Sequence, residues 1–238
     1  SNLENAQSSD LTRGKNMIQE QESFNKYFHD VKKIWSKLSH PNRIIPFCTP
    51  LTKNPNFLVI GKNHSNNFDP FDDDKNNEIA DAFSKEIAKE NTFMEHSHSF
   101  AKGINRVVFE INKEHESFFI SKKWIGTNRC AIQTDSKGLG EIPKHPKYEE
   151  CQKDMDKLLR NLIQFLKPKN VILSGVFACN LFYREKSLQD MRCKRVSLGK
   201  DSNQTFNLIP VEHFSMNYNT KKIVDRISDA IKTGYCDF

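Results

Sequence analysis

Two polar loops carry side chains suited to hold a small planar polar ligand. The first loop, at residues 61–65, contains Asn63, and the second, at residues 211–215, contains His213. Each loop directly follows a short apolar run that is typical of a buried strand. In open α/β sheets, binding sites form in the crevice outside the carboxyl ends of the strands. An amide and an imidazole at two such ends offer hydrogen-bond donors and acceptors, so we expect a site there.

The apolar runs before these loops belong to a set of four predicted strands. Each run is short and continuous, as expected of a strand buried on both faces of a parallel sheet. For the second strand, an apolar run at 118–120 competes with the one that we favour. The four predicted strands are Phe57–Ile60, Trp124–Thr127, Val171–Gly175 and Phe206–Val211.

Predicted helices alternate with these strands. The clearest has an apolar stripe on one face and ends before Pro168. The alternation favours a three-layer α/β/α fold with a central, mostly parallel, four-stranded sheet. We expect residues 1–40 to form an N-terminal polar segment and helix, and residues 41–238 to form the α/β domain. The predicted helices span 16–38, 77–90, 99–112, 148–166, a short stretch near 178–182, and 220–232.

Composition restricts the functional classes only mildly. The net charge of +6 permits nucleic-acid binding without demanding it. The six cysteines form no C-x-x-C pair, so we expect a reducing, cytoplasmic setting without disulfides. No secretory signal is visible, and no apolar stretch approaches the ~18 residues that a membrane span requires. We therefore expect a protein without membrane contact, and we expect it to be a monomer.

The stretch from 124 to 183 resembles the uracil-DNA glycosylase superfamily. In that family a strand ending in "TN" precedes a helix, an "LKP" turn and an apolar strand ending in "G-x-x-A". The matching residues here are Thr127-Asn128, Glu150-Cys151, Leu158-Leu159, Leu166-Lys167-Pro168, Val171–Gly175 and Ala178. Their order and spacing together carry the resemblance, which extends over about residues 57–233.

The two strand-end loops look like the two catalytic motifs of this superfamily. The segment 61–65 is similar to the G-x-N-P-G motif of the mismatch-specific and single-strand-selective branches, and 213–215 is similar to the H-P-S motif. His64 and Phe214 replace the prolines of these motifs. The resemblance implies a monofunctional DNA glycosylase that hydrolyses the N-glycosidic bond of uracil or a related damaged base. We expect no iron–sulfur cluster, metal or other cofactor, because the N-terminal cysteine pair of the cluster-bearing branches is missing.

The resemblance also implies roles for individual residues. Asn63 would order the attacking water, and His213 would donate a hydrogen bond to the uracil O2 as negative charge develops. Asn128 would read the Watson–Crick edge of a base flipped out of the stack. Further substrate contacts are expected from Gly61 and His64, and from Phe68 or Phe71 as a stacking platform.

DNA contacts are expected after the second motif, where the family inserts a loop into the minor groove. Met216 or Tyr218 would wedge into the vacated stack. A basic run at 192–195 is a further candidate for phosphate contact. Lys62 should point away from the face of Asn63, so we expect no lyase activity. The predicted DNA-binding residues are Ser215, Met216, Asn217, Lys221 and Lys222.

Two other functions remain open from the sequence. The replaced prolines and the acidic segment 66–78 favour a catalytically inactive glycosylase fold that binds nucleic acid or a protein. A hydrolase acting on a free nucleoside or nucleotide is a third possibility, although the chain has no Gly-rich phosphate-binding loop.

Overall fold

The structure is a computed structural model of the chain, and it describes ten stretches of the sequence. These are residues 22–38, 44–47, 49, 51–63, 99–114, 124–134, 139–184, 187–198, 204–216 and 220–233. The predicted helix at 77–90 and the competing strand at 118–120 lie outside the described residues.

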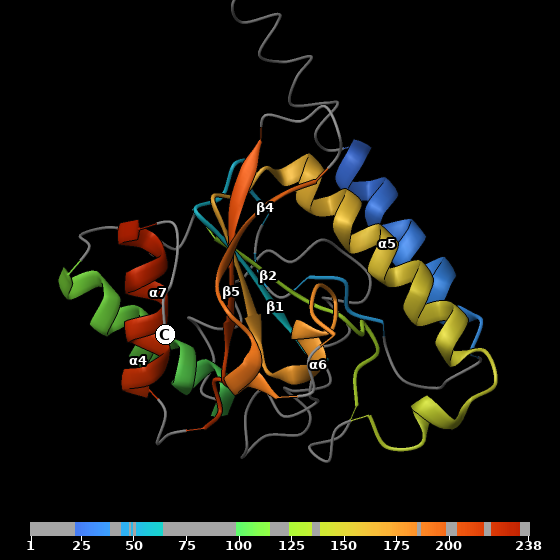
Figure 1. Ribbon diagram of the computed structural model, residues 1–238. Coiled ribbons are helices and arrows are strands. Elements are labelled where there is room, and N and C mark those ends of the chain that lie inside the picture. The colour runs from blue at the N-terminus through green and yellow to red at the C-terminus, as the bar shows by residue number, and fades with distance from the viewer. Residues whose placement is uncertain are drawn as a thin grey trace, which may run out of the picture.

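The centre of the fold is a five-stranded sheet in the order β2-β1-β3-β5-β4 (Figure 1). The first four strands in this order are parallel, and β4 pairs antiparallel with β5 at the edge. The four predicted strands are confirmed, but the prediction of a four-stranded sheet is wrong. The strands are β1 (Phe57–Gly61), β2 (Trp124–Asn128), β3 (Asn170–Ser174), β4 (Lys194–Ser197) and β5 (Thr205–Val211).

Side chains of the apolar strands contribute to two hydrophobic layers, one on each face of the sheet. Every residue of β1, β2 and β3 is buried. Along β1, Leu58 and Ile60 belong to one apolar cluster, whereas Phe57 and Val59 belong to the other. This alternation explains the continuous apolar run, because successive side chains of a strand point to opposite faces.

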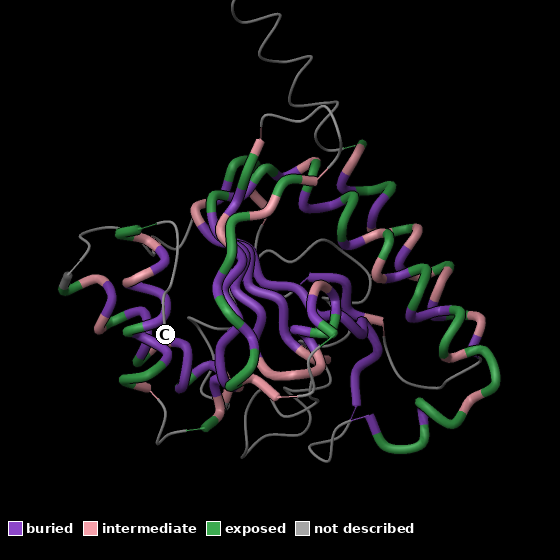
Figure 2. Tube along the Cα trace, viewed as in Figure 1, coloured by how far each residue is buried: buried purple, intermediate pink, exposed green. Residues whose placement is uncertain are grey.

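Helices cover both faces of the sheet (Figure 1). The helix at residues 22–36 and α5 pack on one face, and α4 and α7 pack on the other. Figure 2 shows the buried sheet between them, with exposed residues on the outer sides of the helices. The other helices of the described residues are α4 (Ser99–Glu114), α5 (Tyr148–Leu166), α6 (Val176–Cys179) and α7 (Thr220–Thr233), with short 3₁₀ turns η1 (Ile142–Lys144) and η2 (Leu188–Asp190).

The predicted helices are largely confirmed within the described residues. Helix α5 has the predicted bounds, because its apolar stripe is long and Pro168 follows a left-handed Lys167 (φ 53°). Helices α4 and α7 extend one or two residues beyond the predicted ends. The short predicted helix near 178–182 lies a few residues earlier, and the N-terminal helix is seen at 22–36.

The N-terminal helix shares its core with the sheet. Its residues Val31 and Trp35 are fully buried in the same apolar cluster as Leu159 of α5. Among the helices of the described stretches, none combines the length and hydropathy needed to cross a bilayer. The expectation of no disulfide is wrong at Cys193, which is disulfide-bonded.

Candidate functional site

The two predicted motifs lie at the same edge of the sheet. The strands β1, β2, β3 and β5 are parallel and in register, so all four end on one side. Gly61 is paired with Asn128 at the ends of β1 and β2, and Ser174 is paired with Val211 at the ends of β3 and β5. Asn63 therefore follows β1, Asn128 ends the neighbouring strand β2, and His213 follows β5 on the other side of β3.

The loop after β1 stays attached to the chain after β2. The amide of Arg129 donates to the carbonyl of Gly61 (3.0 Å), and the amide of Cys130 donates to that of Lys62 (2.9 Å). Beyond these bonds, the side-chain nitrogen of Asn63 donates to the Thr134 hydroxyl. The parallel ladder thus continues past the strands and fixes Asn63 relative to Asn128.

Asn128 packs closely against Gly61. A Cβ atom at position 61 would lie 2.5 Å from the Asn128 side-chain oxygen, a distance at which one of the two must move. The Asn128 residue is 6% exposed. Glycine at position 61 is therefore required for space, and it sets where the Asn128 amide lies.

A buried ion pair holds the residue after Asn128. The Arg129 guanidinium donates to both carboxylate oxygens of Asp156 on α5 (2.8 and 2.6 Å) and to the carbonyl of Phe177 on α6 (2.7 Å). The main-chain oxygen of Arg129 accepts from Gln152 (3.2 Å). Bidentate pairing of this kind restricts the guanidinium to one orientation. The chain at 128–130 is thus tied to β1, α5 and α6 at once.

His213 is half-buried, and Ser215 faces one of its ring nitrogens. The amide of Ser215 donates to His213 Nδ1 (3.4 Å), and the Ser215 hydroxyl lies 2.7 Å from the same nitrogen. A main-chain amide can only donate, so this contact favours the tautomer in which Nδ1 accepts and the proton of the neutral ring is on Nε2. Burial lowers the pKa of His213, and the nearby positive charge of Lys62 lowers it further. The ring is therefore a neutral Nε2–H donor near neutral pH.

Phe100 connects the two halves of the site. Its ring centroid lies 5.1 Å from that of His213, in an edge-on arrangement, and its Cζ atom lies 3.9 Å from the Cβ position of Gly61. Phe100 is not among the site residues predicted from the sequence. The position of Phe100 could have indicated its role. A helix that connects two parallel strands starts at their carboxyl edge, and Phe100 lies at the start of such a helix. The predicted contacts His64, Phe68 and Phe71 lie outside the described residues.

Phe214 has a packing role at the position where the family motif has proline. Its side chain is buried and its ring centroid lies 5.3 Å from that of Phe100. Its amide donates to the Ser174 hydroxyl (3.3 Å), a bond that proline is unable to make. A Cβ atom on Gly103 would lie 1.6 Å from the Phe214 carbonyl oxygen, so helix α4 lies directly against this turn.

Gly175 packs against the ring of His213. Its φ is +83°, a conformation that residues with a side chain rarely adopt, and its Cβ position lies 3.5 Å from the His213 ring. The chain therefore passes from β3 into α6 through a turn that leaves room for the imidazole.

The predicted DNA-binding residues fall into different environments. Met216 is 43% exposed, whereas the Ser215 hydroxyl is bonded to His213. Lys221 pairs with Asp225 one turn along α7 (3.0 Å), and Lys222 pairs with the buried Glu212 (2.8 Å). Asn217 lies outside the described residues. The basic run at 192–195 contains the start of the edge strand β4.

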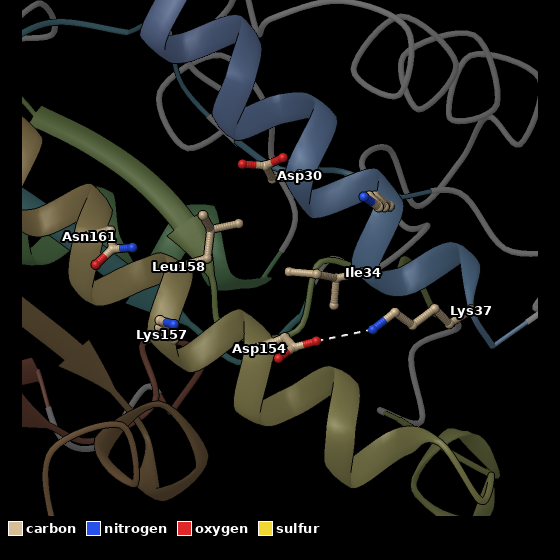
Figure 3. Close-up of a pocket in the computed structure, with 8 residues that line it drawn as sticks. Asp30, Ile34, Lys37, Asp154, Lys157, Leu158 and Asn161 are labelled. Atoms are coloured by element: carbon tan, nitrogen blue, oxygen red, sulfur yellow. Dashed lines mark hydrogen bonds and ion pairs between the residues drawn. The ribbon is translucent and has the colours of Figure 1, made fainter.

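A separate groove lies away from the strand ends, between the N-terminal helix and α5 (Figure 3). Its volume is about 390 Å³, and an ion pair from Lys37 to Asp154 crosses it (3.1 Å). Within the described stretches, no group of three or more histidine, cysteine, aspartate or glutamate side chains is placed to hold a metal ion.

No protein-family model matches the chain, and no curated protein is significantly similar to it in sequence. The resemblance to the uracil-DNA glycosylase superfamily therefore stays a prediction from the residues.

Proposed function

We propose that the protein is a monofunctional DNA glycosylase of the uracil-DNA glycosylase type, acting on uracil or a related damaged base. The observation that supports this proposal is the placement of Asn63, Asn128 and His213 at one edge of the sheet. Each is the residue that the corresponding motif would require, and each lies at the carboxyl end of a different parallel strand.

The His213 environment suits a base that leaves as an anion. Cleavage of the glycosidic bond places negative charge on the uracil, and a positioned donor stabilises that charge. The proton on Nε2 is the donor, and Ser215 holds the ring in the required tautomer. The nearby charge of Lys62 favours an anion at the same position.

The two asparagines would have different ligands: Asn63 would bind the attacking water, and Asn128 would bind the base. The Asn63 nitrogen donates to Thr134, so its amide oxygen lies on the other side of the group, where it would accept a hydrogen bond from the attacking water. Asn128 would bind the Watson–Crick edge with a donor and an acceptor. The close approach of Gly61 fixes its orientation, which is what discrimination between uracil and cytosine needs.

Phe100 is the described aromatic residue best placed to stack on the base, because its ring lies between Gly61 and His213. Met216 is the exposed apolar side chain nearest in sequence to His213, and it would fill the vacated stack.

The proposal is tested by incubating the full chain with labelled oligonucleotides that carry uracil in a single strand, opposite guanine and opposite adenine. Alkali then cleaves any abasic site. The variant His213→Ala should lower the excision rate by about 10²–10³-fold. The control is His29→Ala, an exposed histidine on the N-terminal helix, which should leave the rate unchanged. Excision that survives His213→Ala would remove His213 from the mechanism.

A second variant tests the base-reading part of the proposal. Gly61→Ala places a methyl group where the Asn128 oxygen now lies, so it should weaken discrimination between uracil and cytosine. The Asn63→Ala variant should instead lower the rate on every substrate, with Asn161→Ala on α5 as the exposed control. The same discrimination in wild type and Gly61→Ala would argue against Asn128 as the base reader.

One observation favours a second function, a nucleic-acid-binding module without catalysis. Asn128 is 6% exposed, which leaves little of its amide for a base to contact. DNA binding that persists without base release from any of the substrates would favour this function over the glycosylase.

A further inference from the structure

Helix α4 carries a stripe of large exposed side chains that the proposed site does not use. Its members are Lys102, Arg106, Phe109 and Lys113, and all four are exposed. Their spacing of four, three and four residues places them on one face of the helix. The buried residues of α4, such as Ile104 and Ile111, lie on the opposite face against the sheet. We call these four residues the α4 stripe.

Phe109 is the unusual member of the stripe. It is 64% exposed, more than any other large hydrophobic side chain in the described stretches. The ammonium of Lys113 lies 4.4 Å from its ring centroid, so one face of the exposed ring contacts a cation. The solvent side of an amphipathic helix ordinarily carries polar residues, and here the aromatic ring lies among basic ones.

Charge along the stripe has one sign. The three titratable members are all basic. Glu110 lies beside the stripe and is bonded to Lys113 (2.8 Å). Over the ~16 Å from residue 102 to 113, cations thus flank an aromatic ring on both sides.

The stripe begins beside the candidate site. Phe100, two residues before Lys102, lies against His213 in the first turn of the same helix. From there α4 runs away from the strand ends along the outside of the sheet, next to α7 (Figure 1). The α4 stripe and the candidate site are therefore neighbours along one helix.

We propose that the α4 stripe binds the single-stranded flank of a nucleic acid whose target nucleotide occupies the strand-end site. Surfaces for single strands combine cations that follow the phosphates with aromatic rings on which bases stack, whatever the sequence. Lys102, Arg106 and Lys113 supply the cations, and Phe109 supplies the ring. The choice of nucleic acid as the partner, and the placement of its target nucleotide in the strand-end site, rest on the proposed function.

The test is binding of the full chain to a short fluorescent oligo-dT at several salt concentrations. The triple variant Lys102→Gln, Arg106→Gln, Lys113→Gln should lower the affinity and reduce the salt slope by about 2, since each phosphate contact on a single strand contributes about 0.7. The variant Phe109→Ala should lower the affinity by about 5- to 150-fold with little change in slope. Circular dichroism checks that α4 stays folded.

The chain offers matched controls on its other face. Lys33, Lys153 and Lys157 are exposed lysines on the N-terminal helix and α5, and their triple change to Gln removes the same charge. Phe28 is the control for Phe109, because the ammonium of Lys32 also lies over its ring (4.7 Å). Both controls should bind oligo-dT like the wild type. An equal loss in the lysine control would mean that net charge alone drives binding, and it would overturn the proposal.

Three further outcomes are decisive. Binding of phosphatidylserine vesicles that needs the α4 stripe, with no binding of oligo-dT, would overturn the proposal in favour of a membrane surface. Uracil excision from a single strand that is the same in the α4 variants and in wild type at low oligonucleotide concentration would overturn it while leaving the proposed function intact. Stripe-dependent oligo-dT binding without any excision would support the stripe and count against the glycosylase.

Discussion

The two halves of the candidate site are held in place by different means. After β1 and β2, main-chain hydrogen bonds continue past the strands, and the buried Arg129 guanidinium fixes the chain behind Asn128. After β5, contacts from two helices hold the turn with His213. Arg226 of α7 donates to the Pro210 carbonyl (2.8 Å), and α4 lies against Phe214. The first half depends on main-chain bonds and a buried ion pair, and the second depends on contacts from α4 and α7, so substitutions should affect them separately.

The largest effect is expected when the buried ion pair of the first half is broken. The side chains of Arg129 and Asp156 are 10% and 16% exposed. Asp156→Ala leaves the guanidinium with little access to water and without its carboxylate, which should cost about 3–5 kcal/mol of unfolding free energy. Urea denaturation measures the change.

Asp154→Ala is the matched control, two residues away on the same helix. Its partner Lys37 is more accessible, and exposed pairs contribute about 0–1 kcal/mol. If both substitutions cost the same, the Arg129 pair does not stabilise the first half more than a surface pair does.

The second half should be most sensitive where α4 touches the Phe214 turn. Gly103→Ala would ordinarily stabilise a helix by up to ~1 kcal/mol. Here the added methyl group would overlap the Phe214 carbonyl, so we expect a net loss of about 2–3 kcal/mol in unfolding free energy. Lys102→Ala, at the exposed neighbouring position, should have little effect.

Proton NMR of the His213 ring separates the two halves. The ring signals should shift in Gly103→Ala, because the turn moves, and should stay in place in Asp156→Ala. Ring signals that move in both variants would show that the halves are coupled rather than independent.

Sequence patterns predicted the parts of this molecule that depend on local hydropathy. β1, β2 and β3 were predictable because each is buried on both faces, and α5 because an apolar stripe is followed by a stop signal. Strand β4 was missed because it is a charged edge strand, held by main-chain bonds to β5 that leave no hydropathy pattern.

For the site, the positions of the residues could be predicted from the sequence, but their contacts could not. Asn63, Asn128 and His213 follow predicted strands, so the topology brings them to one edge. The contacts that orient them join residues far apart in the sequence, such as Asn63 with Thr134 and Arg129 with Asp156. No periodicity marks such pairs, and only the folded chain reveals them.

A smaller loss of stability is expected when the ion pair between Lys222 of α7 and Glu212, the residue before His213, is removed. The Glu212 side chain is 10% exposed and pairs with Lys222, so Lys222→Met should cost about 1–2 kcal/mol of unfolding free energy. Lys221→Met removes an exposed i,i+4 pair with Asp225 and should cost about 0.3–0.5 kcal/mol. Urea denaturation of the two variants compares them directly. Equal costs would mean that Lys222 adds nothing to the second half beyond surface charge.

The smallest expected effect is on the pH dependence of stability. It arises from an electrostatic interaction between the two halves of the site. Burial and the positive charge of Lys62, which lies in the first half, lower the pKa of His213 in the second. As the pH falls below about 6.5, the unfolded chain binds a proton at this position that the folded chain does not, so stability is lost with falling pH. His213→Gln removes this part of the pH dependence and isolates it from that of other groups. Lys62→Gln should raise the His213 pKa, measured by NMR titration, and should reduce the loss of stability at low pH. An unchanged His213 pKa in Lys62→Gln would mean that burial alone sets the protonation state, and that the two halves share no charge interaction at this position.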